Sequence, residues 1–280
     1  MRFWSPIVAM TAVICFAIPM STGMGSAEAG TSVESGFAGP ARGIQPASSL
    51  APVNGNSSQQ FTSRNWDGYV TYSSTAGTDF NKVRATWIQP VVRCEVAQAW
   101  TVFWIGLDGW YDGTVEQGGS SAYCPSAGAT PEYDIWWEMY PTNSIQTVLT
   151  IKPGDHITAS VTYSTTSSRF AIFVADTTTK KSFSRSELCA SDLVCERSSA
   201  DFITEDVGRS GAGSYFPLAD YGTMSYNNAS AVDTSGKSGS ISSDAWLNAA
   251  VTEKSGSTTY AKVSPLRDSG TSFSTTWAHR

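Results

Sequence analysis

The first residue to suggest chemistry is Glu138, which lies in the aromatic segment YDIWWEMYPTNS at residues 133–144. Its sequence neighbours include Trp136, Trp137 and Tyr140. Apolar surroundings raise the pKa of a carboxyl group, because burial disfavours the charged form. A carboxyl group in such a place can transfer protons as a general acid or base. The segment therefore indicates either carboxylate chemistry or a surface strand that is merely aromatic.

Histidine chemistry has little support in this chain. The two histidines are His156, which follows a Pro-Gly-Asp turn, and His279, which is next to the last residue. A Ser-His-Asp triad or a two-histidine zinc site would need one of them, and neither has suggestive neighbours. We expect both at the surface, and the hydrolytic options therefore fall on carboxylates.

A second carboxylate motif is the string Asp268-Ser269-Gly270-Thr271, which matches the short catalytic string of pepsin-like aspartic peptidases. Those enzymes need two aspartates that share a proton. Arg267 precedes the string, where apolar strand residues are usual, and the second candidate, VDTSGK from Val232, has its glycine one place late. We interpret both strings as turns rich in Ser and Gly.

Strand alternation separates the aromatic segment into two faces. Successive side chains of a strand point to opposite sides of the sheet. One face then carries Asp134, Trp136, Glu138 and Tyr140, and the other carries Tyr133, Ile135, Trp137 and Met139. The first face is polar and aromatic, which suits a bound peptide or polysaccharide, and the second suits a core. A half-exposed sheet with aromatic side chains is the simpler alternative.

The elements that must position these residues are strands. Runs of β-branched and aromatic residues, separated by Gly, Asp, Asn, Pro and Ser, indicate β-structure. No window of 12 residues has a helical stripe. The runs occupy residues 67–73, 82–92, 99–107, 133–141, 147–164, 169–186, 200–207 and 221–232. This pattern predicts an all-β fold, an antiparallel sandwich or barrel.

The N-terminal residues predict export. Residues 1–29 resemble a signal peptide, with Arg2 before an apolar run and small residues ending at Ala29. That run is shorter than the roughly 20 residues of a membrane span. Residues 30–60 have the composition of a propeptide or a disordered leader. Residues 61–280 have one even composition and predict a single domain, secreted and extracellular, with no membrane attachment after signal cleavage.

Charge and cysteine content limit the partners and suggest cross-links. A net charge of −6 argues against nucleic acid, which needs a basic surface. Four cysteines remain after removal of the signal peptide, and an even number in an exported chain suggests two disulfides. Three pairings are possible. Proximity in sequence favours Cys94 with Cys124 and Cys189 with Cys195.

Several rare motifs resemble, in order and spacing, those of the glutamic peptidases called eqolisins, or peptidase family G1. They are NWDGYV, VRATWIQP, FWIGLDG, EQGG, YDIWWEMYP, CERSSADFITEDV and YFPLADYGTMSYNNA, and they extend from about Asn65 to about Ala229. The resemblance implies a two-sheet antiparallel β-sandwich of the jelly-roll or concanavalin-like kind, with a concave substrate cleft. It also implies polypeptide substrates, no metal and no cofactor, and we expect a monomer.

The resemblance implies a role for each matched residue. The catalytic pair falls on Gln117 of EQGG and Glu205 of ITED. Residues that support this pair or bind substrate fall on Trp66, Trp104, Asp108, Trp136, Glu138 and Tyr140. By this comparison Glu138 loses its leading place and becomes a residue of the cleft floor, hydrogen-bonded to the pair or to substrate. Val207 departs from the family, which has Phe there, so one aromatic wall of the cleft is expected to be missing.

The chemistry of such a pair is consistent with the residue types. A carboxyl group near its unperturbed pKa of about 4.3 can take a proton from an attacking water and then give it to the leaving nitrogen in mildly acidic solution. A neutral amide N–H can stabilise the oxyanion. The alternatives are a jelly-roll glycoside hydrolase, using carboxylates such as Glu138 and Glu205, and a non-catalytic sandwich that binds carbohydrate or peptide. A glycoside hydrolase would hold its carboxyl groups about 5.5 Å or about 6.5 to 9.5 Å apart.

Overall fold

The computed structural model describes residues 45–46, 58–73, 79–209 and 214–279. These residues all belong to the larger of two compact units, Ser32–Arg280. The predicted signal peptide, residues 1–29, lies outside the described residues. Of the predicted leader, residues 30–60, the structure describes Gln45–Pro46 and residues 58–60, and strand pairing includes some of them.

The described residues form strands and one short turn of 3-10 helix. The strands are β1 (Gln45–Pro46), β2 (Gln59–Ser63), β3 (Trp66–Tyr72), β4 (Phe80–Ile88), β5 (Ala99–Leu107), β6 (Val115–Cys124), β7 (Glu132–Tyr140), β8 (Gln146–Thr150), β9 (His156–Ser164), β10 (Arg169–Asp176), β11 (Lys181–Leu188), β12 (Ser199–Asp206), β13 (Thr223–Asp233), β14 (Ser238–Gly239), β15 (Leu247–Ser255), β16 (Thr258–Thr259), β17 (Ala261–Val263) and β18 (Phe273–Trp277). The helical turn η1 spans Asp268–Gly270.

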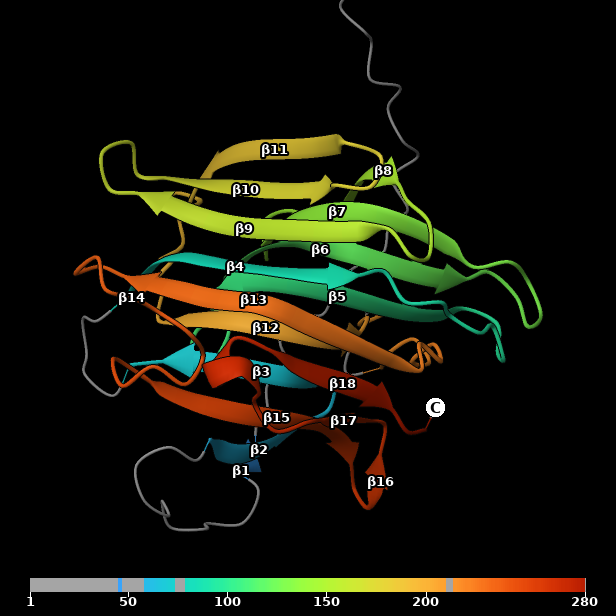
Figure 1. The fold of residues 1–280 in the computed structure, drawn as a ribbon. Coiled ribbons are helices and arrows are strands. Elements are labelled where there is room, and N and C mark those ends of the chain that lie inside the picture. The colour runs from blue at the N-terminus through green and yellow to red at the C-terminus, as the bar shows by residue number, and fades with distance from the viewer. Residues whose placement is uncertain (1–44, 47–57, 74–78, 210–213, 280) are drawn as a thin grey trace, which may run out of the picture. The chain divides into compact units, whose positions relative to one another are not determined.

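Within the described part of the chain the strands form two sheets. The first has the order β1-β2-β15-β3-β12-β5-β6-β7-β8, and β16 pairs with β15 (Figure 1). The second has the order β11-β10-β9-β4-β13-β18-β17, and β14 pairs with β13. The pairs are antiparallel except for β2 with β15, which is parallel. The predicted antiparallel β-sandwich is confirmed.

The core lies between the two sheets. Phe103 and Ile105 of the first sheet belong to the same buried cluster as Val161 and Ile172 of the second. The opposite face of the first sheet carries a separate buried cluster, which we call the site face; it includes Trp66, Trp100, Trp104, Trp136 and Ile203. Both faces of the central strands are therefore covered.

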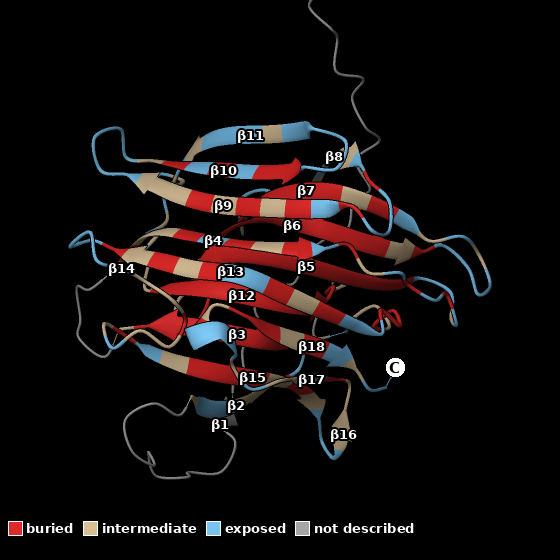
Figure 2. Cartoon of the chain, viewed as in Figure 1, coloured by how far each residue is buried: buried red, intermediate tan, exposed pale blue. Residues whose placement is uncertain are grey.

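Burial on both faces explains why alternation is weak in parts of the sequence. β5 and β12 are buried along their whole length, whereas β11 is mostly exposed (Figure 2). A strand covered on both sides needs no polar face. On β7 the predicted alternation is confirmed: Tyr133, Ile135, Trp137 and Met139 join the core, and Trp136 and Tyr140 lie on the site face.

The strand prediction missed several elements. β6 reads VEQGGSSAYC, and its glycines and serines have low β-propensity, yet it lies between β5 and β7 in the middle of the sheet. β15 and the C-terminal strands β16 to β18 were also missed. Tertiary pairing overrides local preference at these positions, because a strand between two neighbours makes hydrogen bonds on both sides.

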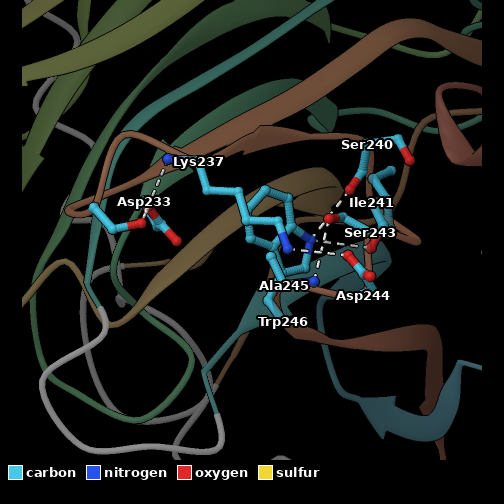
Figure 3. Close-up of polar contacts among 9 residues, drawn as sticks. Asp233, Lys237, Ser240, Ile241, Ser243, Asp244, Ala245 and Trp246 are labelled. Atoms are coloured by element: carbon cyan, nitrogen blue, oxygen red, sulfur yellow. Dashed lines mark hydrogen bonds and ion pairs between the residues drawn. The ribbon is translucent and has the colours of Figure 1, made fainter.

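The two strings that imitate an aspartic-peptidase motif are turns, as expected. Asp233 accepts hydrogen bonds from the hydroxyl of Ser235 and the backbone N–H of Lys237, which closes the turn after β13. Figure 3 shows this turn together with the ion pair between Lys237 and Asp244. Asp268 lies in the exposed turn η1 and accepts a hydrogen bond from the hydroxyl of Ser272. Each carboxylate thus accepts hydrogen bonds that stabilise the turn in which it lies.

Two disulfides link the chain, and the predicted pairing is confirmed. Cys94 bonds to Cys124, and Cys189 bonds to Cys195. The first ties the segment before β5 to the end of β6. No helix in the described ranges is both long and apolar enough to cross a membrane. His156 and His279 are exposed, as predicted.

Candidate active site

Glu205 lies near the end of β12, which pairs with β3 on one side and β5 on the other. Its carboxylate is buried on the site face, with 5% of the residue exposed. One oxygen, Oε1, accepts a hydrogen bond of 2.6 Å from Asn65 Nδ2. The other, Oε2, accepts a hydrogen bond of 2.8 Å from the indole N–H of Trp104. A donor from the residue before β3 and a donor from β5 therefore hold the carboxylate in place.

Burial and these donors act on Glu205 in opposite directions. Burial raises the pKa of Glu205 from 4.5 to about 8, because the charged form loses its contact with water. The N–H donors of Trp104, Trp66 and Asn65 lower the pKa, because they favour the charged form. Burial is the larger effect. The sequence-based argument assumed an unperturbed carboxyl group, and the structure corrects that assumption.

Gln117 and Glu138 are opposite each other on the paired strands β6 and β7. Gln117 Nε2 donates a hydrogen bond of 2.7 Å to Glu138 Oε2. Gln117 is 6% exposed and Glu138 is 1% exposed. Burial and the nearby charge of Glu205 raise the pKa of Glu138, and the bond from Gln117 lowers it. The expected hydrogen bond between Glu138 and one member of the predicted pair is therefore present.

The close approach of β5 and β6 positions the indole of Trp104, which donates a hydrogen bond to Glu205. Gly119 of β6 is opposite Trp104 of β5. A Cβ atom on Gly119 would lie 2.0 Å from the carbonyl oxygen of Phe103, so no other residue fits without movement of the strand. The ring of Trp104 packs edge-on against Trp66 with centroids 5.2 Å apart. Gly119, two residues after the predicted catalytic glutamine, thus allows β5 and β6 to lie close together under the site.

Trp136 and Tyr140 lie on the same face of β7 as Glu138. Trp136 is 1% exposed, and its indole N–H has no hydrogen-bond partner among the described residues. The indole of Trp66 is also buried, and it lies near enough to Glu205 to lower the pKa of that carboxyl group. Tyr140 is half-buried. The tryptophans therefore combine apolar walls with N–H donors on the site face.

Asp108 lies apart from the two pairs just described. It follows β5 with φ of 68°, a left-handed conformation that Asp tolerates. Its carboxylate accepts hydrogen bonds from the backbone N–H of Ser198 at 2.6 Å and the hydroxyl of Thr114 at 3.3 Å. Burial, followed by the charge of Asp112, raises its pKa to about 8. Asp108 thus links the turn before β6 to the residue before β12.

The first sheet holds further buried carboxyl groups that the sequence-based prediction did not include. Burial raises the pKa of each, and each has at least one carboxylate oxygen without a hydrogen-bond partner in the described ranges. They are Asp67, Glu116, Asp201, Asp206 and Glu253. Their burial depends on both sheet faces being covered, and no local sequence pattern indicates it.

Val207 is fully buried on the site face, and an aromatic ring lies close to it. The carbonyl of Val207 accepts a hydrogen bond of 2.8 Å from the backbone N–H of Phe216. The ring of Phe216 packs against Trp100 with centroids 5.5 Å apart, and the guanidinium of Arg209 lies 4.5 Å above it. Phe216 thus supplies an aromatic side chain beside the position where the family pattern led us to expect a gap.

Among the described residues, Asn65 is the hydrogen-bond partner of Glu205 that sequence reasoning missed. It lies inside the motif NWDGYV, but a single asparagine before a strand carries no distinctive signal. Of the residues predicted for the site, the structure joins Glu205 to Trp104 and Gln117 to Glu138 by hydrogen bonds, and packs Trp66 against Trp104. Among the residues described, no group of three or more His, Cys, Asp or Glu is arranged to hold a metal ion.

This β-sandwich, with a buried Glu and a buried Gln on one sheet face, is of the glutamic peptidase class. The family model of the peptidase A4 family matches residues 64–275, and the chain belongs to that family. The chain is therefore a member of a peptidase family, as the motifs predicted, and membership favours a peptidase over the glycoside hydrolase and the binding module. No curated protein sequence matches the chain.

Solved structures of glutamic peptidases resemble the chain over most of its length. Scytalido-glutamic peptidase, solved with a peptide-based transition-state analog, is 26% identical with a TM-score of 0.64, covering 77% of this chain and 98% of that chain. SCP-B, an eqolisin solved with the tripeptide Ala-Ile-His, is 25% identical with a TM-score of 0.62 and the same coverage. Aspergilloglutamic peptidase from Aspergillus niger is 25% identical with a TM-score of 0.54, covering 65% of this chain and 100% of that chain.

Proposed function

We propose that this protein is a secreted, acid-active endopeptidase whose catalytic pair is Glu205 and Gln117. The observation that carries the proposal is the hydrogen bonding of the Glu205 carboxylate, which accepts N–H donors at both oxygens inside a buried site. The complexes of related enzymes with a peptide-based analog and with a tripeptide support polypeptide substrates.

In the proposed reaction the ionised carboxylate of Glu205 takes a proton from water while the water oxygen attacks the scissile carbonyl carbon. The carbonyl oxygen becomes an oxyanion. Glu205 then gives the proton to the peptide nitrogen, the carbon–nitrogen bond breaks, and an acid and an amine are released. One carboxyl group thus acts first as base and then as acid.

Gln117 is suited to stabilise the oxyanion. Its amide nitrogen carries two hydrogens and gives one to Glu138, which leaves the second for the substrate oxygen. Its Oε1 is buried without a hydrogen-bond partner among the described residues and can accept a hydrogen bond from the attacking water. An oriented donor of this kind contributes about 10² to 10³ in rate. Glu138 holds the amide in this orientation.

Two opposing effects limit the working pH range. The base form of Glu205 becomes scarcer as the pH falls, because burial raises its pKa to about 8. The buried carboxyl groups are accommodated most easily in their neutral form, which is lost as the pH rises. Activity should therefore be limited by protonation of Glu205 on the acid side and by stability on the alkaline side.

The localisation and assembly belong to the same proposal. The predicted signal peptide at residues 1–29 and the two disulfides support secretion, because disulfides persist in oxidising compartments. We propose that the working enzyme is a monomer with polypeptide substrates and no cofactor. The preferred peptide sequence depends on the walls of the site face.

The test is cleavage of denatured casein between pH 3 and 7 by the wild type, Glu205→Gln and Gln117→Ala. We expect cleavage by the wild type that survives pepstatin and a chelator, and no cleavage by either variant. Glu132→Gln, an exposed change on β7, is the matched control and should retain activity. Activity retained in Glu205→Gln would refute the mechanism, and hydrolysis of xylan or glucan without casein cleavage would favour a glycoside hydrolase.

A further inference from the structure

Asn65 makes the shorter of the two hydrogen bonds to Glu205. It is fully buried just before β3, and its Nδ2 lies 2.6 Å from Glu205 Oε1. The two residues are 140 positions apart in sequence, and the backbone also joins them, because the N–H of Asp206 donates to the carbonyl of Asn65 at 3.2 Å. Asn65 is therefore anchored by main chain and side chain to the strand end that carries Glu205.

The hydroxyl of Ser63 determines which way the amide of Asn65 faces. Ser63 Oγ accepts hydrogen bonds from the backbone N–H of Asn65 at 3.4 Å and of Trp66 at 3.2 Å. A hydroxyl has a single hydrogen, and Ser63 gives it to Asn65 Oδ1 at 3.3 Å. With its oxygen turned to Ser63, Asn65 can present only N–H to Glu205.

Both partners of the carboxylate are consequently donors. Asn65 Nδ2 and the indole N–H of Trp104 cannot accept a proton from Glu205, so both interact best with the ionised form. Hydrogen bonds to a charged group are shorter and stronger than neutral ones. Bonds at both oxygens also restrict rotation of the carboxylate plane.

We propose that Asn65, oriented by Ser63, is a positioning residue that holds the Glu205 carboxylate ionised and correctly turned for the attacking water. This inference rests on the proposed function. Without the Asn65 amide, less would oppose the rise that burial causes in the pKa of Glu205. A smaller fraction of the enzyme would then have an ionised Glu205 at a given acid pH. The acid limb of the reaction would then move to higher pH.

Other charges also reach Glu205, and the experiment must separate them from the effect of Asn65. The groups that interact electrostatically with Glu205 are Glu138 from β7, Asp206 from β12, Glu253 from β15 and Tyr215 from the segment after β12. Arg64 interacts in the same way with Asp206 and Tyr215. All of them remain in a variant that changes Asn65 alone. A comparison of that variant with the wild type therefore cancels their shared contribution.

The experiment measures kcat/KM against pH from 3 to 10, a range that spans the pKa of about 8 of Glu205, for the wild type, Asn65→Ala, Ser63→Ala and Ser63→Thr. We expect Asn65→Ala to lose about 10-fold to 100-fold in kcat/KM on the acid limb, as for a hydrogen bond to a charged group, and to recover as the pH rises. Ser63→Ala frees the amide and should shift the limb in the same direction. Ser63→Thr keeps the hydroxyl and should restore the wild-type profile.

Asn143→Ala, an exposed change in the turn after β7, is the matched control and should leave the profile unchanged. An Asn65→Ala profile that falls equally at every pH would mean a structural role only and would overturn the inference. If Asn65→Ala does not fold, the pair of Ser63 variants decides, and identical profiles for them would also overturn it. Retained activity in Glu205→Gln would instead refute the proposed function, so the two failures are distinguishable.

Discussion

The buried carboxyl groups should make the folded protein less stable as the pH rises from about 4 to about 8. Below this range both the folded and the unfolded chain hold the protons, and these groups contribute little to the pH dependence. Within it the unfolded chain releases protons that the folded chain still holds, so the free energy of unfolding falls. Above it the folded chain must carry buried charge.

Two groups give the magnitude. Burial raises the pKa of Glu205 from 4.5 to about 8 and that of Asp108 from 3.8 to about 8. At about 1.4 kcal/mol for each pH unit, each corresponds to on the order of 5 kcal/mol. Their sum is comparable with the whole stability of a typical domain, about 5 to 15 kcal/mol. The pKa is also raised for Asp67, Glu116, Glu138, Asp201, Asp206 and Glu253.

The assay is urea unfolding of the wild type at pH 3.5, 5, 6.5 and 8, followed by tryptophan fluorescence. Asp108→Asn keeps an oxygen that accepts the N–H of Ser198 but cannot ionise, so its slope against pH should be flatter by roughly 1.4 kcal/mol per unit between pH 5 and 7. The exposed change Asp192→Asn is the control. A midpoint that stays constant or rises with pH in the wild type would refute the reasoning.

Three further changes test the site. Glu138→Gln keeps a side-chain oxygen for the Gln117 amide, so it should lower kcat/KM in casein cleavage, but by less than Glu205→Gln; an equal loss would contradict the supporting role. Gly106→Ala would place Cβ 3.0 Å from the ring of Trp104 and 3.1 Å from Cβ of Gln117, so kcat should fall with a smaller loss of thermal stability; unchanged kcat would show that the contact can relax. Trp104→Phe removes the N–H on Oε2 and should move the acid limb of kcat/KM to higher pH, whereas an unmoved limb would mean that the bond contributes little.

Local pattern was enough to predict much of this protein. The alternation of residues 133–140 correctly separated core from site face, and eight runs of β-branched and aromatic residues correctly indicated an all-β fold. Sequence proximity correctly paired the cysteines. The order of rare motifs predicted a family that the family model confirms. These features can be predicted because each depends on residues close together in the chain or on a specific sequence motif.

The remaining features depend on which strands pair and on what covers them. β6 is a strand because β5 and β7 flank it, although its sequence has low β-propensity. Asn65 reaches Glu205 because β3 pairs with β12 across 140 residues. The raised pKa of Glu205 exists because both faces of β12 are covered. Hydrogen bonding between distant strands and loss of solvent are properties of the assembled sheets, so only the tertiary structure decided them.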